Sequence, residues 1–318
     1  MVTLDQLQGA ADLVHKVMTP TAQICWPLLS ERCGAEVWVK HENHTPIGAF
    51  KVRGGLVYMA DLRRRRPDIA GVITATRGNH GQSVGFAARR MGIKAVIVVP
   101  HGNSQEKNRA MRALGAELVE HGNDFQAAYE HAAILADERG LHMLRSFDPH
   151  LVAGVGSYAL ELFGAVGDID TVYVPIGLGS GICGTISARD ALGLKTRIVG
   201  VVAENAAAYA LSFAAGRPVS TNSADTMADG VACRVPDSDA LAVIQRGADR
   251  VVTVSEDEIM AAMRHYFTDT HNLAEGAGAA PLAALIKESR HMAGKRVALV
   301  LSGGNIDRPL YADILGRA

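Results

Sequence analysis

Five runs of apolar, largely β-branched residues recur along the chain without alternating with polar residues. The runs cover residues 71–75, 95–99, 171–174, 197–202 and 297–301. Uninterrupted hydrophobicity over such short lengths is typical of strands that are covered on both faces, as in parallel sheets. Stretches with helical patterns lie between the runs, so strands and helices alternate. The sequence therefore predicts an α/β fold with mostly parallel, twisted sheets.

The ends of several predicted helices can also be read from the sequence. Ser104 and Asp124 are each placed to cap a helix, and Ser255 with Glu258 has the spacing of a capping box. We expect the chain of 318 residues, of which 48% are hydrophobic, to form two lobes, because this length exceeds what one core usually holds.

Composition narrows the class of protein. The net charge of −1 gives no reason to expect a nucleic-acid partner. The four cysteines form no CxxC pair, which favours a reducing compartment. No apolar segment is long enough for a signal peptide or a membrane span. We therefore expect a soluble, cytoplasmic protein without a membrane partner.

A turn of small residues leads into Lys51. Gly48, Ala49 and Phe50 precede this lysine, and such a turn can present one amine inside a cleft. An amine held there is a candidate Schiff-base nucleophile. Taken alone, a lysine at a helix start is more often a surface residue, so other segments must decide.

A glycine-rich loop follows the apolar run at residues 171–174 and opens a helix. Backbone N–H groups and the positive end of a helix can together hold a phosphate there. A second interpretation is a dinucleotide site, because residues 179–184 fit G-x-G-x-x-G and Glu204 ends the next strand. An NAD-dependent oxidoreductase of this kind would leave Lys51 without a role.

Four motifs occur in a fixed order along the chain, at residues 45–51, 76–82, 177–181 and 302–305. Together they resemble the pyridoxal-phosphate enzymes of the tryptophan-synthase-β fold, called type II. Within that group the likeness is to the threonine/serine dehydratases and serine racemase. The dehydratase branch is also suggested by residues 226–230 and 275–278.

The resemblance implies two lobes, each a three-layer α/β/α sandwich. The large lobe, which binds pyridoxal 5′-phosphate, would comprise residues 1–67 and 147–318, and the small substrate-side lobe residues 68–146. The family also implies a homodimer. Because the chain ends shortly after the Ser302 motif, we expect no regulatory domain and no control by isoleucine.

The resemblance also assigns roles to individual residues. Lys51 would bind the cofactor covalently and then act as the catalytic base, with Phe50 beside it. Asn79 would contact the 3′-oxygen of the cofactor, and Ser302 would meet the ring nitrogen, where a neutral hydroxyl makes the ring a weaker electron sink. The phosphate would be held by Gly177, Leu178, Gly179, Ser180 and Gly181. The substrate would be bound by Thr76, Arg77, Gly78 and His80.

Two positions depart from the family pattern. Serine racemase has a serine where this chain has Arg77, and an arginine cannot readily take a proton, which disfavours racemisation. Arg77 either clamps an acid group of the substrate or points to solvent. Relatives bind a divalent ion through a glutamate and an aspartate; Glu204 matches the first, but Ala210 replaces the second. We therefore predict no metal.

The sequence predicts a pyridoxal-phosphate-dependent dehydratase, or ammonia-lyase. It would convert a β-hydroxy amino acid, such as L-threonine or L-serine, to a 2-oxo acid and ammonia. Within the fold, the alternatives are an amino-acid racemase and a dehydratase for 3-hydroxyaspartate, phenylserine or a hydroxyectoine-derived amino acid. A catalytically silent cofactor-binding protein and an NAD-dependent oxidoreductase are the alternatives outside this activity.

Overall fold

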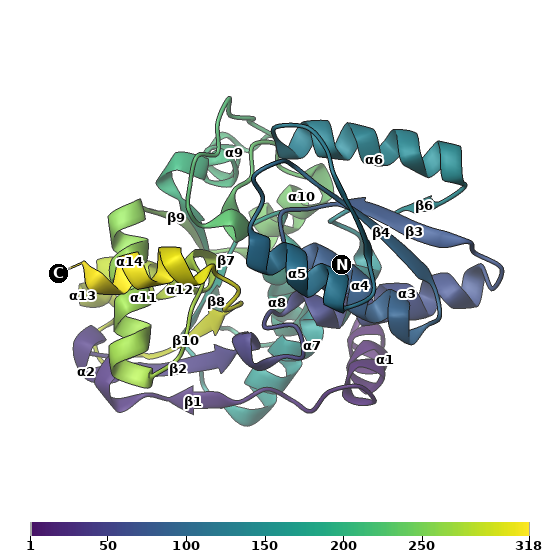
Figure 1. The fold of residues 1–318 in the computed structure, drawn as a ribbon. Helices are drawn as coiled ribbons and strands as arrows, with labels where there is room; N and C mark the ends of the chain where they lie inside the picture. Colours follow the sequence, from purple (N-terminus) through teal and green to yellow (C-terminus); the bar gives the residue numbers. More distant parts are fainter. Residues whose placement is uncertain (1, 318) are drawn as a thin grey trace.

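The computed structural model describes residues 2–317 and contains two sheets, each covered by helices on both faces (Figure 1). The larger sheet has the strand order β1-β2-β10-β7-β8-β9, and β1 alone in it runs antiparallel to its neighbour. Its strands are β1 Gln23–Cys25, β2 Glu36–His41, β7 Thr171–Pro175, β8 Arg197–Ala203, β9 Arg250–Val254 and β10 Arg296–Leu301.

The smaller sheet has the order β5-β4-β3-β6, and all its strands are parallel. These strands are β3 Gly71–Ala75, β4 Lys94–Val99, β5 Glu117–Glu120 and β6 His142–Met143. Helix α6 (Phe125–Arg139) packs on one face. The other face is covered by α3 (Lys51–Arg65), α4 (Asn79–Arg90) and α5 (Gln105–Ala113).

Two layers of helices also enclose the larger sheet. One face carries α1 Leu4–His15, α7 Pro149–Ala165, α8 Ser180–Ala191, α9 Ala208–Ala215 and α10 Ser238–Gly247. The other carries α2 Pro27–Cys33, α11 Glu256–Thr270, α12 Gly276–Lys287, α13 Ser289–Met292 and α14 Arg308–Gly316. Short 3-10 turns are η1 Glu42–His44, η2 Glu204–Ala206 and η3 Asp229–Val231.

The predicted fold class is confirmed, because the five apolar runs lie in the parallel strands β3, β4, β7, β8 and β10. The predicted helix starts are present as well. The side chains of Ser104 and Asp124 accept backbone N–H groups of α5 and α6, and Ser255 with Glu258 forms a capping box at α11. Where one lobe ends and the other begins stays a prediction.

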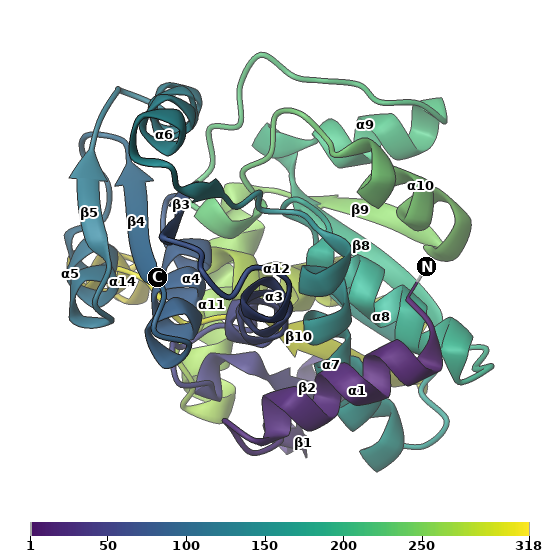
Figure 2. The same cartoon turned by 90° about the vertical axis from the view of Figure 1, so that its right-hand side faces the viewer.

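Helix α3 joins the two lobes, since it packs on α4 of the smaller lobe and on α7 of the larger one. Helix α1 lies against both α7 and α3 (Figure 2). The predicted site residues follow the carboxyl ends of β3, β7 and β10 or begin α3. This is the edge at which open parallel sheets bind ligands.

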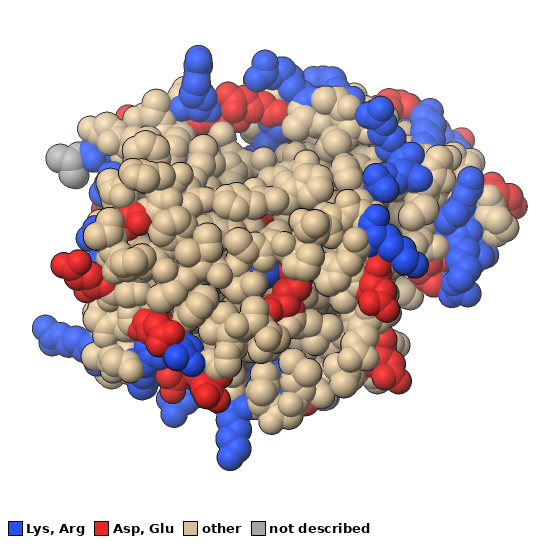
Figure 3. All heavy atoms as spheres, turned by 90° about the horizontal axis from the view of Figure 1, so that it is seen from below, with Lys and Arg blue, Asp and Glu red and all other residues tan. Residues whose placement is uncertain are grey.

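One face of the molecule has an uneven distribution of charge. In Figure 3 the acidic and basic side chains lie mainly around the edge, and the centre is mostly uncharged.

None of the helices within residues 2–317 has the length and apolar character needed to cross a bilayer.

Candidate active site

The turn before Lys51 is bridged by the side chain of Thr45. The Thr45 hydroxyl accepts the Ala49 N–H at 2.9 Å and donates to the Ala49 carbonyl at 2.8 Å. Gly48 has a φ of +68°, and a Cβ there would lie 2.8 Å from Asn305 Oδ1, so only glycine fits. This geometry places Lys51 as the first residue of α3.

The amine of Lys51 is enclosed by protein, although the residue as a whole is half-buried. Burial lowers the pKa of Lys51 to about 8, against the opposing effect of the nearby Glu275 carboxylate. A substantial fraction of the amine is therefore neutral near physiological pH. A neutral amine is what nucleophilic attack on a carbonyl requires.

The glycine-rich loop follows β7 and leads into the 12-residue helix α8. A Cβ at Gly177 would lie 2.3 Å from the Gly230 carbonyl oxygen, and Gly179 has a φ of +102°. The N–H groups of residues 177–181 donate no hydrogen bond to any described part of the chain. The loop is therefore a cradle of free N–H groups at a helix N-terminus, which fits a phosphate.

Tyr158 supports this cradle from α7. Its hydroxyl donates to the Gly181 carbonyl at 2.9 Å, and its ring packs edge-on against Phe50. The Phe50 ring in turn lies 3.6 Å from where a Cβ of Gly181 would be. The ring of the residue before Lys51 thus lies next to the glycine-rich loop.

The segment after β3 forms a second helix N-terminus, that of α4. The Gly78 N–H donates to the Thr76 hydroxyl at 3.0 Å, so the N–H of Gly78, a predicted substrate donor, is already used within the loop, whereas the O–H of Thr76 stays free to donate. The Asn79, His80 and Gly81 N–H groups have no acceptor within residues 2–317. These groups, together with the helix end, can bind a carboxylate.

His80 and Arg77 differ sharply in environment. Burial, and secondarily the charge of Lys51, lowers the pKa of His80 to about 3, so the ring is neutral. Its buried Nε2 atom has no hydrogen-bond partner in the structure. Arg77 is exposed, and its guanidinium makes no ion pair with any residue that the structure describes.

The end of β10 meets the lysine turn. The Phe50 N–H donates to the Ser302 carbonyl at 2.9 Å, and Ala49 pairs with Gly303. Ser302 is a buried residue, and its hydroxyl forms no hydrogen bond to the described chain. It can therefore meet a ligand atom.

Asn79 is held by two residues whose roles the sequence did not reveal. Its amide donates to Glu275 Oε1 at 2.7 Å, and its Oδ1 accepts from Asn305 Nδ2 at 2.8 Å. Burial raises the pKa of Glu275 above its ordinary value, although Lys107 and Asn79 oppose this. Glu275 and Asn305 both lie in segments that look like dehydratase motifs, whereas Lys107 carried no sequence signal.

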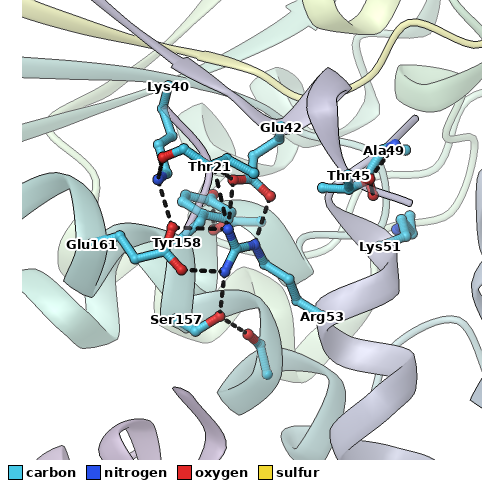
Figure 4. A network of polar contacts seen from close by, with 12 residues as sticks. Thr21, Lys40, Glu42, Thr45, Ala49, Lys51, Arg53, Ser157, Tyr158 and Glu161 are labelled. Atoms are coloured by element: carbon cyan, nitrogen blue, oxygen red, sulfur yellow. Dashed lines mark hydrogen bonds and ion pairs between the residues drawn. The ribbon is translucent and has the colours of Figure 1, made fainter. Parts of the chain in front are cut away.

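A cluster of buried charges anchors the start of α3 (Figure 4). Arg53, two residues after Lys51, is fully buried and donates to Glu42, Glu161, Ser157 and Thr21. Lys40 also pairs with Glu161, at 2.6 Å. Two cations face two carboxylates, so the cluster stabilises the helix that carries Lys51 without adding net charge.

The two remaining sequence hypotheses concern a dinucleotide and a metal. Gly184, the last glycine of G-x-G-x-x-G, serves helix packing, since a Cβ there would lie 2.9 Å from the Gly156 nitrogen on α7. Glu204 is exposed.

Within residues 2–317, no three His, Cys, Asp or Glu side chains are grouped to share a metal ion. The absence of a bound metal stays a prediction.

The structure brings the Lys51 turn, the Asn79 loop, the 177–181 loop and the Ser302 strand end into one cluster. Arg77 alone among the predicted residues is exposed without a described partner. A buried amine of lowered pKa, a phosphate-type cradle, an amide donor and a free hydroxyl fit an aldehyde cofactor that carries a phosphate and a ring nitrogen.

Comparisons with known proteins agree with this fit. The family described as "Pyridoxal-phosphate dependent enzyme" matches residues 14–303. An L-threonine ammonia-lyase of Thermotoga maritima is 35% identical over 321 residues, covering 100% of this chain and 79% of the relative.

Solved structures that resemble this chain include a threonine deaminase and a serine racemase. Threonine deaminase isoform 2 of Solanum lycopersicum matches with a TM-score of 0.90 and 31% identity, over 99% of this chain and 94% of that one. Maize serine racemase matches with a TM-score of 0.91 and 25% identity, over 98% and 96%.

Proposed function

Because this chain belongs to the pyridoxal-phosphate-dependent enzymes, we propose that it is a dehydratase, or ammonia-lyase, for a β-hydroxy amino acid. L-Threonine or L-serine would give a 2-oxo acid and ammonia. The observation that carries the proposal is the clustering of the 177–181 cradle, Asn79 and Ser302 around the turn that presents the enclosed amine of Lys51.

The residues of the site divide into those that would hold the cofactor and those that would hold the substrate. Residues 177–181 would bind the phosphate, Asn79 the 3′-oxygen and Ser302 the ring nitrogen, with Phe50 beside Lys51. The free N–H groups at the start of α4 would bind the substrate carboxylate. The bound pyridoxal phosphate supplies a ring that withdraws electrons from the α-carbon of the amino acid.

The proton transfers belong to the chain. Lys51, with a pKa of about 8, would take the α-proton of the substrate once its amine is free. The β-hydroxyl would then take up one proton and leave as water, which balances the proton removed by Lys51, and hydrolysis of the released enamine would give the 2-oxo acid and ammonia. Because Ser302 is a neutral hydroxyl, it does not keep the ring nitrogen protonated. Negative charge at the α-carbon is then poorly stored, which favours loss of the β-group.

Amino-acid racemisation is the second candidate function, because the serine racemase of maize shares the fold at 25% identity. Racemisation needs an acid or base on the face opposite Lys51. Arg77 stays protonated at neutral pH and is a poor base. The position therefore supports elimination over racemisation.

One assay tests the reaction. The purified holo-protein is incubated with L-threonine, L-serine, 3-hydroxyaspartate and phenylserine, and 2-oxo acid, ammonia and the enantiomers of residual substrate are measured. We expect equal amounts of 2-oxo acid and ammonia without accumulation of D-enantiomer. Racemised substrate without 2-oxo acid would instead support the second candidate, and Lys51→Ala serves as the inactive control.

We also propose a cytoplasmic homodimer, following the family that the sequence resembles. The mostly uncharged centre of the face in Figure 3 supports a protein contact. The near-neutral net charge supports the absence of a nucleic-acid partner. Light scattering on the eluted protein tests the assembly, and we expect about twice the mass of one chain.

A further inference from the structure

Three polar side chains from three separate segments form a line beside Lys51. Asn305, which follows β10, donates to Asn79 at the start of α4, at 2.8 Å. Asn79 donates to Glu275, which precedes α12, at 2.7 Å. Asn305 also donates to the carbonyl of Ile47 in the lysine turn, at 2.8 Å.

The direction of every bond in this line follows from its first acceptor. The Ile47 carbonyl is a backbone group and can only accept, so the Asn305 group that faces it must be the NH₂. The same NH₂ faces Asn79, which must therefore present Oδ1 to it. The NH₂ of Asn79 is then turned toward the Glu275 carboxylate. No amide in the line can be reversed without placing two acceptors against each other.

This orientation leaves one donor free. The Asn79 NH₂ carries two hydrogens, and Glu275 takes one of them. The second hydrogen has no partner within residues 2–317, and the Asn79 side chain is only half-buried. The line therefore leaves a single Asn79 N–H group unpaired in the cluster that contains the lysine turn.

We propose that Asn305 is a positioning residue that fixes the carboxamide of Asn79, so that this free N–H meets the phenolic oxygen of the cofactor. The inference rests on the cofactor contact proposed above for Asn79. Asn305 itself would not touch the cofactor. Gly48 keeps the place of Asn305 open, since a Cβ at position 48 would lie 2.8 Å from Asn305 Oδ1.

Removing or reversing the line should weaken cofactor binding through Asn79. In Asn305→Ala the carboxamide of Asn79 keeps only its bond to Glu275 and is held less firmly. We then expect the Kd for pyridoxal phosphate to rise roughly 3- to 10-fold, the range for one neutral hydrogen bond. In Asn305→Asp the carboxylate can only accept, so Asn79 must reverse and present its oxygen to the cofactor. A larger rise, on the order of tenfold or more, is expected there.

The experiment titrates the apo-protein with pyridoxal phosphate and follows the visible absorption band and its dependence on pH. An N–H donor stabilises the deprotonated phenolic oxygen, so its loss should also move the pH midpoint of the band upward. The variants are Asn305→Ala, Asn305→Asp, Asn79→Ala and the double variant Asn79→Ala/Asn305→Ala. Asn43→Ala is the matched control, because Asn43 donates to the Leu273 carbonyl and does not contact Asn79.

The double variant separates positioning from general structural support. If Asn305 acts through Asn79, Asn305→Ala has no further effect on the Kd once Asn79 is alanine. An equal effect in both backgrounds would overturn the inference and leave the proposed function intact. No effect of Asn79→Ala itself would instead remove the proposed contact between Asn79 and the cofactor.

Thermal unfolding of each variant shows whether the chain is folded. Should Asn305→Ala fail to fold, Asn305→Ser provides a smaller perturbation, for which the same non-additivity with Asn79→Ala is expected.

Discussion

The ammonium of Lys107 lies 2.9 Å from the carboxylate of Asp229, and this ion pair joins α5 of the smaller lobe to η3 of the larger one. Burial lowers the pKa of Lys107, but Glu275 and Asp229 outweigh it and leave the pKa above its ordinary value. Beside the pair, Ser104 donates to Asp307. These two contacts connect the N-terminal part of α5 to the larger lobe, next to the candidate site.

Breaking the Lys107–Asp229 ion pair should weaken the contact between the two lobes and lower the activity of the site. For Lys107→Met we expect kcat/KM to fall about tenfold, comparable to the loss of one charged hydrogen bond. Lys94→Met is the matched control, because the exposed Lys94–Glu117 pair lies within the smaller lobe. Steady-state kinetics and hydrogen exchange of α5 test this. Equal effects of the two substitutions would argue against an interlobe role for Lys107.

The lowered pKa of Lys51 predicts how fast the apo-protein takes up its cofactor. Only the neutral amine reacts with an aldehyde, so the rate should rise with pH and reach half its maximum near pH 8. Stopped-flow measurement of the visible band between pH 6 and 10 gives this midpoint. A midpoint near 10.5, the ordinary value for lysine, would show that burial does not tune this amine.

Arg77 tests which substrate the site prefers. If its guanidinium clamps an acid group, Arg77→Ala should lower kcat/KM for 3-hydroxyaspartate about tenfold and change that for L-threonine less than about twofold. Arg90→Ala, on the exposed far end of α4, is the control. An unchanged ranking of substrates would mean that Arg77 only faces solvent.

The buried charges around Arg53 should matter for stability much more than surface pairs do. Arg53→Met leaves Glu42 without an ion-pair partner among the residues that the structure describes, and Glu161 with Lys40 and the partly exposed His15. We expect a loss of about 3–5 kcal/mol in the free energy of unfolding. Arg65→Met removes the ion pair between the exposed Arg65 and the partly buried Asp61, which keeps Arg64 as a partner, and should cost less than about 1 kcal/mol. Urea denaturation measures both, and similar losses would contradict the assignment.

The same cluster gives a dependence of stability on pH. Burial alone would raise the pKa of Glu161. Arg53 and Lys40 outweigh burial and lower this pKa to about 2, below its ordinary value of 4.5. The folded state therefore binds fewer protons than the unfolded state between these values, so this stabilisation is present above pH 4.5 and lost as pH falls toward 2. In Arg53→Met that acid-dependent loss should be smaller.

How much the sequence predicts depends on whether an interaction is local. Continuous apolar runs predicted β3, β4, β7, β8 and β10, and single capping residues such as Ser104 predicted helix starts, because both signals lie within a few neighbouring residues. The antiparallel edge strand β1 has only three residues, too few for a period to be read.

The polar partners of the site could not be predicted in the same way. Asn79 contacts Glu275 and Asn305, which lie 196 and 226 residues away along the chain, and Arg53 reaches Glu161 across 108 residues. Such pairings depend on how the two lobes pack, and no local pattern encodes them. Lys107 reads as an ordinary lysine on a polar helix until the lobes are assembled.

Reduction of the holo-protein with borohydride, followed by peptide mapping, tests the central claim most directly. The account predicts that the cofactor mass is found on Lys51 in the wild-type chain and on no lysine in Lys51→Ala. Recovery of that mass on another lysine of the wild-type chain, with Lys51 unmodified, would contradict it.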